Sequence, residues 1–463
     1  NVLKMSIKRC LFIFVALIVS QLALAAHLWI EAENFENKGG WVVDQQFMDL
    51  MGSPYLMAHG MGVPVKDAST TINFPEDGTY YVYVRTYNWT SPWSEMKGPG
   101  KFVLKIDNRR LTPILGDEGE EWMWQSAGKV SVKAGGSIIS LHDLTGFNGR
   151  CDAIYLTTEA GKLPPASEQE LEVFRRNMLN LPFKPIETTE YDLVVVGGGI
   201  AGICAATSAA RFGCKVALVN DRPVLGGNNS SEIRVHLGGT IEVGPNKGLG
   251  RMIREFGHST EGNAQSAEKY EDEKKLKVVA DEKNITLFAN YRAIAVEMKD
   301  KKISAVVIKH IETGEEQTLA APLFSDCTGD GTIGFLAGAD YRMGREAKAE
   351  YGEDLAPEKA DKMTMGASVQ WYSVETEQKS SFPKFNYGIT FSEDNCEKVT
   401  MGEWQWETGM NFNQIDDFER IRDYGLLVVY SNWSFLKNRL KDNHEYLNRK
   451  LEWVAYIAGK RES

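Results

Sequence analysis

The chain has 463 residues, of which 43% are hydrophobic and 25% are charged, a composition typical of a folded globular protein. Its formal net charge of −11 argues against nucleic acid or an anionic membrane as a partner. Both are bound by basic surfaces, and the sequence has no long cluster of Lys and Arg. This length allows two or three domains, each with its own core.

Residues 5–25 have the pattern of a secretory signal peptide. Lys8 and Arg9 precede an apolar run from Leu11 to Val19, and Ala23-Leu24-Ala25 is the small-x-small pattern that a signal peptidase cleaves. The apolar run is shorter than the roughly 20 residues of a membrane span, which favours cleavage over anchoring. We therefore expect a secreted or periplasmic protein with no stable membrane insertion after cleavage.

The cysteines beyond this segment favour neither disulfides nor a metal cluster. They are odd in number, widely spaced and contain no C-x-x-C pair, so a disulfide framework, zinc or an iron–sulfur cluster is not predicted. These cysteines are Cys151, Cys204, Cys214, Cys327 and Cys396.

Residues 26–160 predict an all-β sandwich of the jelly-roll kind. Short alternating runs at Tyr80–Arg85, Lys101–Ile106, Ser137–Leu141 and Ala153–Leu156 are separated by Gly, Pro, Asn and Asp. This spacing of strands and turns is typical of sandwiches. No long stretch of helical periodicity interrupts the runs.

Three segments of this region, at Trp29–Phe35, Gly78–Tyr81 and Cys151–Ile154, resemble galactose-binding-like carbohydrate-binding modules. The resemblance implies that acidic residues of the opening strand can hold a structural calcium ion, and Glu31 and Glu33 match that strand. Two carboxylates do not supply the six or more oxygen ligands that calcium takes, so no metal site is predicted.

Several tryptophans in this region have two possible roles. An indole can stack on a sugar ring, but tryptophan is also well buried on average, so the same residues can belong to the core. The domain can equally serve as a packing partner for an enzyme domain. The residues concerned are Trp89, Trp93, Trp122 and Trp124.

Residues 161–190 predict a helical linker. Pro164-Pro165 is followed by Ser167 and Glu170, a pattern that starts a helix, and Leu171, Phe174 and Met178 then share one helical face.

Residues 191–345 predict an α/β Rossmann-type domain. The apolar strand Tyr191–Val196 leads directly into a G-x-G-x-x-G turn, then a helix rich in small residues and the strand Lys215–Val219. Glycines at this turn let the chain bend, let backbone N–H groups approach a pyrophosphate and let the helix pack against the strand. The predicted phosphate-binding residues are Gly197, Gly198, Gly199, Ile200, Ala201 and Gly202.

The ribose contact departs from the usual pattern. The acidic residue expected at the end of the second strand is replaced by Asn220, and Asp221 follows it. An asparagine side chain can also bond a ribose hydroxyl. We therefore predict Asn220 as the ribose contact, with Asp221 as the alternative.

Two later stretches identify the dinucleotide. The segment Asp221–Ser230 resembles the one that follows the second strand in FAD-dependent oxidoreductases, and Thr328–Gly331, after the strand Pro322–Asp326, resembles their third flavin-contacting stretch. The resemblance implies FAD as the cofactor. It adds Arg222, Gly226, Gly227, Asn228, Ser230, Gly329, Asp330 and Gly331 to the predicted cofactor-binding residues.

Within this family, the run from Gly226 to His236 and the late Gly459–Ser463 look like the group related to the flavin domain of heterodisulfide reductase. Residues 346–463 are expected to form a β-rich and helical substrate cap, with a helix over Phe418–Leu440. Because a closing cofactor strand is expected beyond residue 463, we expect the chain to be truncated at its C-terminus.

The segment that follows Gly226-Gly227, the Gly-Gly pair, is the best candidate to lie against the flavin ring. It carries Asn229, Ser231, Arg234 and His236. His236 has a suitable pKa to take a proton from a substrate hydroxyl, and Arg234 can neutralise negative charge on the flavin. The alternative is that His236 only satisfies backbone groups or contacts FAD without reacting.

Together these observations predict an exported FAD-dependent oxidoreductase that transfers hydride from a sugar or glycan-derived substrate to flavin. One alternative is an electron-transfer flavoprotein linked to iron–sulfur centres. Another is a non-catalytic glycan-binding protein whose flavin fold is inert.

Overall fold

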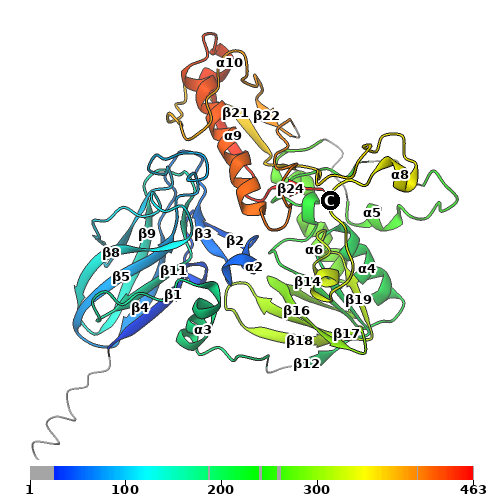
Figure 1. Cartoon of the computed structure of the whole chain (residues 1–463), viewed down its shortest axis with the longest axis horizontal. Coiled ribbons are helices and arrows are strands. Elements are labelled where there is room, and N and C mark those ends of the chain that lie inside the picture. Colours follow the sequence, from blue (N-terminus) through cyan, green and yellow to red (C-terminus); the bar gives the residue numbers. More distant parts are fainter. Residues whose placement is uncertain (1–24, 186–187, 239–241, 258–261, 404, 462–463) are drawn as a thin grey trace, which may run out of the picture.

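The computed structural model describes residues 25–185, 188–238, 242–257, 262–403 and 405–461. The predicted signal segment therefore lies almost wholly outside the described residues. Figure 1 shows three regions: the N-terminal sheets on one side, the α/β region on the other, and a long helix, α9, above and between them. Within the described residues, no helix is both long and apolar enough to cross a membrane.

The N-terminal region consists of antiparallel sheets, as the alternating sequence pattern predicts. One sheet has the order β1-β11-β5-β8, a second β4-β9-β6-β7, and a smaller one β10-β3-β2. Apolar side chains such as Val82, Leu104 and Leu141 fill the core between them. The bounds are β1 His27–Glu31, β2 Val42–Asp44, β3 Tyr55–Ala58, β4 Ala68–Phe74, β5 Gly78–Thr86, β6 Phe102–Ile106, β7 Arg109–Arg110, β8 Met123–Val132, β9 Gly135–Asp143, β10 Gly149–Cys151 and β11 Ala153–Thr157, with short helices η1 Ala32–Asn34 and α2 Met48–Met51.

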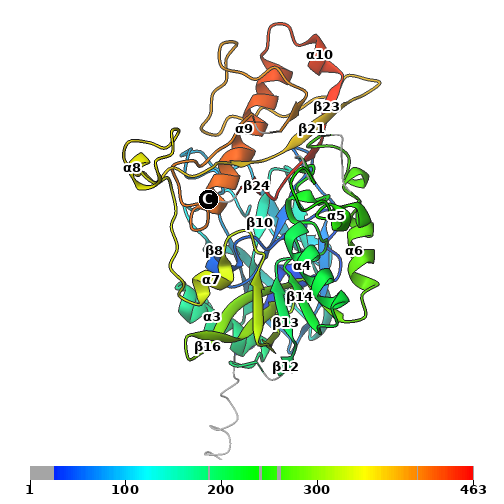
Figure 2. The same cartoon turned by 90° about the vertical axis from the view of Figure 1, so that its right-hand side faces the viewer.

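The α/β region is built on a parallel sheet of order β15-β14-β13-β19. Successive side chains of a strand point to opposite faces. Val195 and Leu218 accordingly pack against the helix side, and Val194 and Val219 pack on the other. Figure 2 shows α4 and α6 covering one face of these strands. The bounds are β13 Leu193–Val196, α4 Ile200–Arg211, β14 Val216–Asn220, α6 Asp272–Ala280, β15 Ile285–Ala289 and β19 Leu323–Asp326.

A second sheet, of order β12-β18-β17-β16, packs on the other face of the parallel sheet. Asp300 and Lys301 form the turn that joins β16 to β17, and both residues have positive φ, 50° and 62°. The bounds are β12 Thr188–Glu190, β16 Tyr291–Lys299, β17 Lys302–His310 and β18 Glu316–Ala320, with η2 Gly227–Asn229, α5 Arg251–Glu255, η3 Ala267–Tyr270, α7 Thr332–Leu336 and α8 Lys348–Tyr351 in the connections.

The C-terminal region holds the predicted helix as α9, Phe418–Asn438. Most of α9 is buried all round, which is typical of a helix inside a core and not on a surface. The other elements are β20 Ala367–Ser368, β21 Trp371–Glu375, β22 Met401–Gly402, α10 His444–Leu447, β23 Arg449–Val454 and β24 Gly459–Lys460.

The sandwich and α9 share one hydrophobic core. Phe47, Met57 and Trp89 of the sandwich cluster with Leu426 and Trp433 of α9. The N-terminal region is therefore not a separate module on a flexible tether, but one wall of a continuous core.

Charged side chains cross the same interface. Nη2 of Arg150 lies 2.5 Å from Oδ1 of Asp423, and Nη1 of Arg422 lies 2.7 Å from Oδ2 of Asp44. Both arginines are fully buried, and Glu419 accepts a further bond from Arg150. A buried charge is tolerated only when it is paired, so these pairs fix α9 against the sandwich in one orientation.

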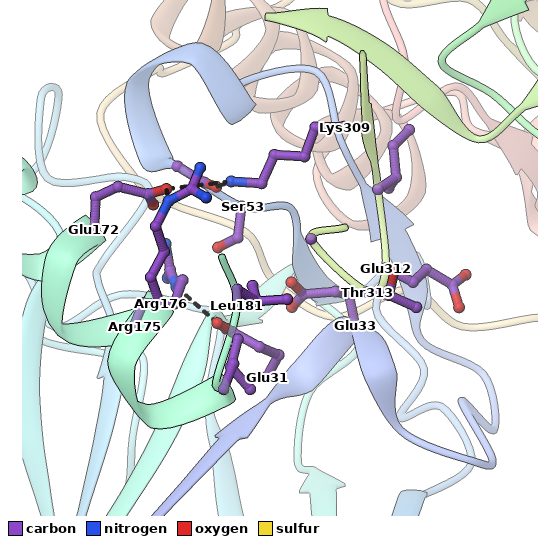
Figure 3. Close-up of a pocket in the computed structure, with 14 residues that line it drawn as sticks. Glu31, Glu33, Ser53, Glu172, Arg175, Arg176, Leu181, Lys309, Glu312 and Thr313 are labelled. Carbon is purple, nitrogen blue, oxygen red and sulfur yellow. Dashed lines mark hydrogen bonds and ion pairs between the residues drawn. The ribbon is translucent and has the colours of Figure 1, made fainter. Parts of the chain in front are cut away.

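The linker helix α3, Glu168–Leu179, begins where the sequence predicts and packs Phe174 against Trp29 and Tyr155. Its Arg175 places Nε 2.7 Å from Oε1 of Glu31. Figure 3 shows this pair beside Glu33 and Lys309, around a cavity of about 20 Å³, enough for one water molecule.

In this geometry, Glu31 and Glu33 are surrounded by other groups of the protein. The guanidinium of Arg175 supplies the positive charge beside Glu31, and burial, together with Glu31 and Asp152, raises the pKa of Glu33 well above its usual range. Across the described part of the chain, no group of three or more His, Cys, Asp or Glu side chains is placed to hold a metal ion.

The four tryptophans are also used for packing. Trp89 is fully buried and donates its indole N–H to the carbonyl of Phe147, so of its two possible roles it has the one in the core. Trp122 packs between Tyr55 and Tyr87. Trp93 packs against Tyr424 of α9 and Trp124 against Trp29, so each of the four has an aromatic or core partner within the protein.

Replacing Arg150 with Ala should lower the free energy of unfolding by about 3–5 kcal/mol, because Asp423 and Glu419 would lose a buried cation. Urea unfolding measures the change. The control is Arg109→Ala, an exposed arginine whose loss should cost less than about 0.5 kcal/mol. A loss below about 1 kcal/mol for Arg150→Ala would contradict this account of the interface.

Candidate cofactor site

The glycine turn between β13 and α4 has the backbone that a dinucleotide site requires. Gly197 has φ of +105°, and a Cβ there would lie 2.2 Å from the carbonyl oxygen of Cys327. A Cβ at Gly202 would lie 1.8 Å from the carbonyl oxygen of Gly197, so only glycine lets α4 start this close to the strand. Ile200 and Ala201 belong to the first turn of α4, whose backbone N–H groups point outward from the N-terminal end of the helix.

The second glycine stretch lies against the first. The N–H of Gly226 donates to the carbonyl of Gly198 at 2.8 Å, and Gly199 and Gly226 form a parallel β-bridge. A Cβ on Gly199 would meet only the Cα of Gly227, at 3.9 Å. The two stretches thus leave a shallow cradle of bare backbone between them.

The third stretch follows β19, the parallel neighbour of β13. The carboxylate of Asp326 accepts N–H groups from Ile333 and Gly334 and so holds the start of α7. A Cβ added at Gly329 or Gly331 would meet no atom within 4 Å, so this loop faces open space. All three predicted stretches therefore meet at the carboxyl edge of one sheet, where ligands of α/β proteins bind.

The polar groups around the cradle are suited to a ligand rich in hydrogen-bonding groups. Among the described residues, buried polar atoms without a partner include Oδ1 of Asn229, Oγ of Ser230 and Nη1 of Arg222. A buried polar atom without a partner costs free energy that a bound ligand can recover. The bare backbone and these atoms together fit the diphosphate and sugar portions of a dinucleotide.

The predicted ribose contact Asn220 is engaged within the protein. Its Oδ1 accepts the N–H of Gly198 at 3.2 Å, and its Nδ2 donates to the carbonyls of Arg222 and Val224. The side chain thus ties the first glycine turn to the following loop. Asp221, the alternative contact, is partly exposed and pairs with Arg292 at 3.0 Å. Both ribose contacts stay predictions.

The C-terminal strand β24 reaches the same loops. Nζ of Lys460 lies 2.7 Å from Oδ1 of Asp330, and the carbonyl of Lys460 accepts Nδ2 of Asn228. Burial lowers the pKa of Lys460, an effect that Asp330 opposes. Lys460 therefore joins the second and third predicted stretches at a point that sequence spacing does not reveal.

The two predicted catalytic residues have different surroundings. Arg234 donates to the carbonyls of Ser231 and Gln265, and its guanidinium lies 4.0 Å above the ring of Trp453. These contacts hold Arg234 within the segment, and its role beside the flavin stays a prediction. His236 is only partly buried, and its Nδ1 lies 2.8 Å from Oδ1 of Asn263.

Glu232 was not identified from the sequence. Burial raises the pKa of its carboxyl to about 7, an effect that Arg222 opposes. Its Oε1 accepts the hydroxyl of Tyr456 at 3.5 Å, and its Oε2 has no partner among the described residues. The sequence around Glu232 does not indicate that its side chain is buried. The burial depends on Tyr456, which is distant in sequence and reaches Glu232 only in the folded chain.

The comparison with known families matches residues 192–463 to the model described as FAD dependent oxidoreductase. The chain belongs to this family. The prediction of FAD as the cofactor is confirmed. The matched range includes all three glycine stretches and Lys460.

Curated relatives match a shorter part of this member of the family. The soluble pyridine nucleotide transhydrogenases of Ectopseudomonas mendocina and Azotobacter vinelandii are each 48% identical to it over 66 residues, which is 14% of this chain and 12% of the relative. The chain therefore spans about an eighth of the length of these relatives.

Similar solved structures include a geranylgeranyl bacteriochlorophyll reductase-like protein from Thermoplasma acidophilum, with 16% identity, 59% of this chain and 66% of that chain covered, and a TM-score of 0.33. A family 35 carbohydrate binding module from Clostridium thermocellum has 16% identity, with 28% of this chain and 97% of that chain covered, and a TM-score of 0.23. The assignment to the family rests on the family match and on the geometry of the site.

Gly199→Ala should separate folding from cofactor binding. The position has an ordinary φ of −68°, and the new methyl group meets no atom closer than 3.9 Å, so the apoprotein should keep its melting temperature. The methyl group would stand where a diphosphate must approach the backbone, and FAD affinity should fall at least about tenfold. Titration of flavin fluorescence measures it. Unchanged FAD affinity would contradict the location of the cradle.

Glu232 should make stability depend on pH. A carboxyl whose pKa rises on folding, here from 4.5 to about 7, binds more protons in the folded state, so stability falls as pH rises through this interval. The slope should reach at most about 1.4 kcal/mol per pH unit. Urea unfolding of Glu232→Gln should lack this part of the slope. An identical pH profile in both proteins would show that Glu232 is not desolvated.

Proposed function

We propose that the protein is an exported FAD-dependent oxidoreductase that moves hydride from a sugar or glycan-derived substrate to flavin. The observation that carries the proposal is the meeting of three glycine stretches at one sheet edge, with His236 shortly beyond the Gly-Gly pair of the second stretch. The run from Gly226 to His236 also supports a relation to the flavin domain of heterodisulfide reductase.

The substrate class and location rest on the N-terminal part of the chain. The sugar or glycan substrate is supported by the resemblance of residues 26–160 to galactose-binding-like modules, and a secreted or periplasmic location by the signal-like residues 5–25. The net charge of −11 supports a small molecule or glycan, and not nucleic acid, as the partner. N-terminal sequencing of the exported protein should start at Ala26; a start at Met5 would overturn cleavage.

His236 has the bonding pattern of a general base. Oδ1 of Asn263 accepts both the backbone N–H of His236 and, at 2.8 Å, a bond from Nδ1 of the ring. An amide oxygen only accepts, so the proton of the neutral ring lies on Nδ1 and the lone pair lies on Nε2.

This arrangement suits the oxidation of an alcohol. Nε2 of His236 would take the hydroxyl proton while the carbinol carbon loses its hydride, and a carbonyl group forms. The flavin, when bound, supplies the hydride acceptor. Asn263 holds the ring in the required tautomer, with its Nδ2 donating toward Glu403.

The test is reduction of the flavin by sugars under anaerobic conditions. The wild-type protein should bind FAD and lose its yellow colour with at least one sugar of a panel of aldoses and oligosaccharides. His236→Ala should bind FAD equally but be reduced about 10²–10⁴-fold more slowly. Asn263→Ala, a positioning variant, should be slowed less, with a shifted pH profile.

A protein that binds FAD and is reduced by no sugar would overturn the substrate class. Wild-type rates in His236→Ala would instead remove this histidine from the reaction. The two failures are distinguishable because only the second leaves sugar oxidation intact.

A further inference from the structure

A cavity of about 200 Å³ lies where the N-terminal sandwich meets the cofactor domain. Val42, Val43 and Gln45, in and just after β2, form one side of it. The loop after β14, with Asp221 and Pro223, and Asn290 after β15 form the other, and the remaining lining residues are Ile311, Glu312 and Tyr456. A pocket for a whole ligand usually measures about 300–1,000 Å³, so this cavity suits one part of a larger molecule.

Gln45 shows that the cavity has room for a polar partner. Its side chain is 97% buried, since only 3% is exposed, and its Nε2 has no hydrogen-bond partner within the described residues. A buried amide donor without an acceptor destabilises the unliganded protein. A ligand that offers an acceptor here would recover that cost.

The walls of the cavity match a purine nucleoside. Val42, Val43 and Pro223 offer apolar surface to a flat ring, while Gln45 Nε2 offers a donor to a ring nitrogen. Asp221 and Asn290 offer oxygen acceptors to an exocyclic amine or to ribose hydroxyls.

The cavity borders the cofactor loops directly. Asp221 and Pro223 belong to the loop that runs from Asn220, bonded to Gly198, to Gly226, which bridges Gly199. Arg292 crosses the same boundary, because it bonds Asp221 of this loop and Asp49 of the sandwich. A dinucleotide whose diphosphate lies on the glycine cradle would therefore extend its nucleoside toward this cavity.

We propose that the N-terminal sandwich is part of the cofactor site, and that Gln45, with Val42 and Val43, encloses the adenosine half of FAD against Asp221 and Asn290. This inference rests on the proposed flavin function. It assigns the sandwich a second role: it closes one end of the cofactor groove, in addition to forming the shared core with α9.

The experiment compares FAD with FMN, which carries the same flavin and one phosphate but no adenosine. Both are titrated into wild-type apoprotein and into Gln45→Leu, which keeps a similar volume and removes the donor. Gln45→Leu should weaken FAD binding about five- to tenfold and leave any FMN binding unchanged. It should not lower the melting temperature of the apoprotein, because it removes a buried donor that has no partner there. The matched control is Gln169→Leu, an exposed glutamine on α3.

Equal FAD affinity in Gln45→Leu and wild type would overturn the proposal. So would AMP binding that depends on Gln45 while FAD binding does not, because the cavity would then take a free nucleotide. A wild-type protein that binds no FAD at all would be a failure of the proposed function. If Gln45→Leu lowered the melting temperature of the apoprotein and weakened FAD and FMN binding equally, the proposed role of the sandwich would also be overturned, because Gln45 would then act on folding alone.

Discussion

The arrangement of the molecule depends on two buried arginines, one in the sandwich and one in α9. Arg150 bonds Asp423 and Glu419 of α9, and Arg422 of α9 bonds Asp44 of β2. Taking such charges out of water is tolerable only while every partner is in place, so the pairs define one relative position of the two regions. The hydrophobic core around Trp433 supplies the non-directional free energy, and the ion pairs supply the orientation.

The arginine of α9 also reaches toward the cofactor site. Nη1 of Arg422 donates to the carbonyl of Tyr456, and the chain continues from there to Lys460, which bonds Asp330. The hydroxyl of Tyr456 in turn faces Glu232, close to the second glycine stretch. A shift of α9 relative to the sandwich would therefore also move the cofactor loops, because residues 456–460 connect the two.

Local features were predictable from the sequence because backbone sterics decide them. Gly197, Gly199 and Gly202 occupy positions where a side chain would clash or would block a ligand, and the strand, turn and helix around them follow directly.

Long-range roles were not predictable. The side chain of Asn220 bonds Gly198 and the following loop, a structural use that needs the folded turn beside it and that the sequence pattern does not indicate. Trp89 shares a core with α9, a helix far away in sequence, so its burial has no local signal. The roles of Glu232 and Gln45 were also not predictable. Glu232 is next to Tyr456, and Gln45 lies beside the cofactor domain, and only the folded chain brings these parts together.

The central claim is that three separate glycine stretches bind one FAD. Hydrogen–deuterium exchange of the apoprotein with and without FAD tests it most directly. Exchange should slow on FAD binding in all three stretches, at residues 197–202, 226–227 and 329–331, while the distant sandwich strand β7 should be unaffected. Protection confined to one of the three stretches, or absent from all of them, would contradict the account.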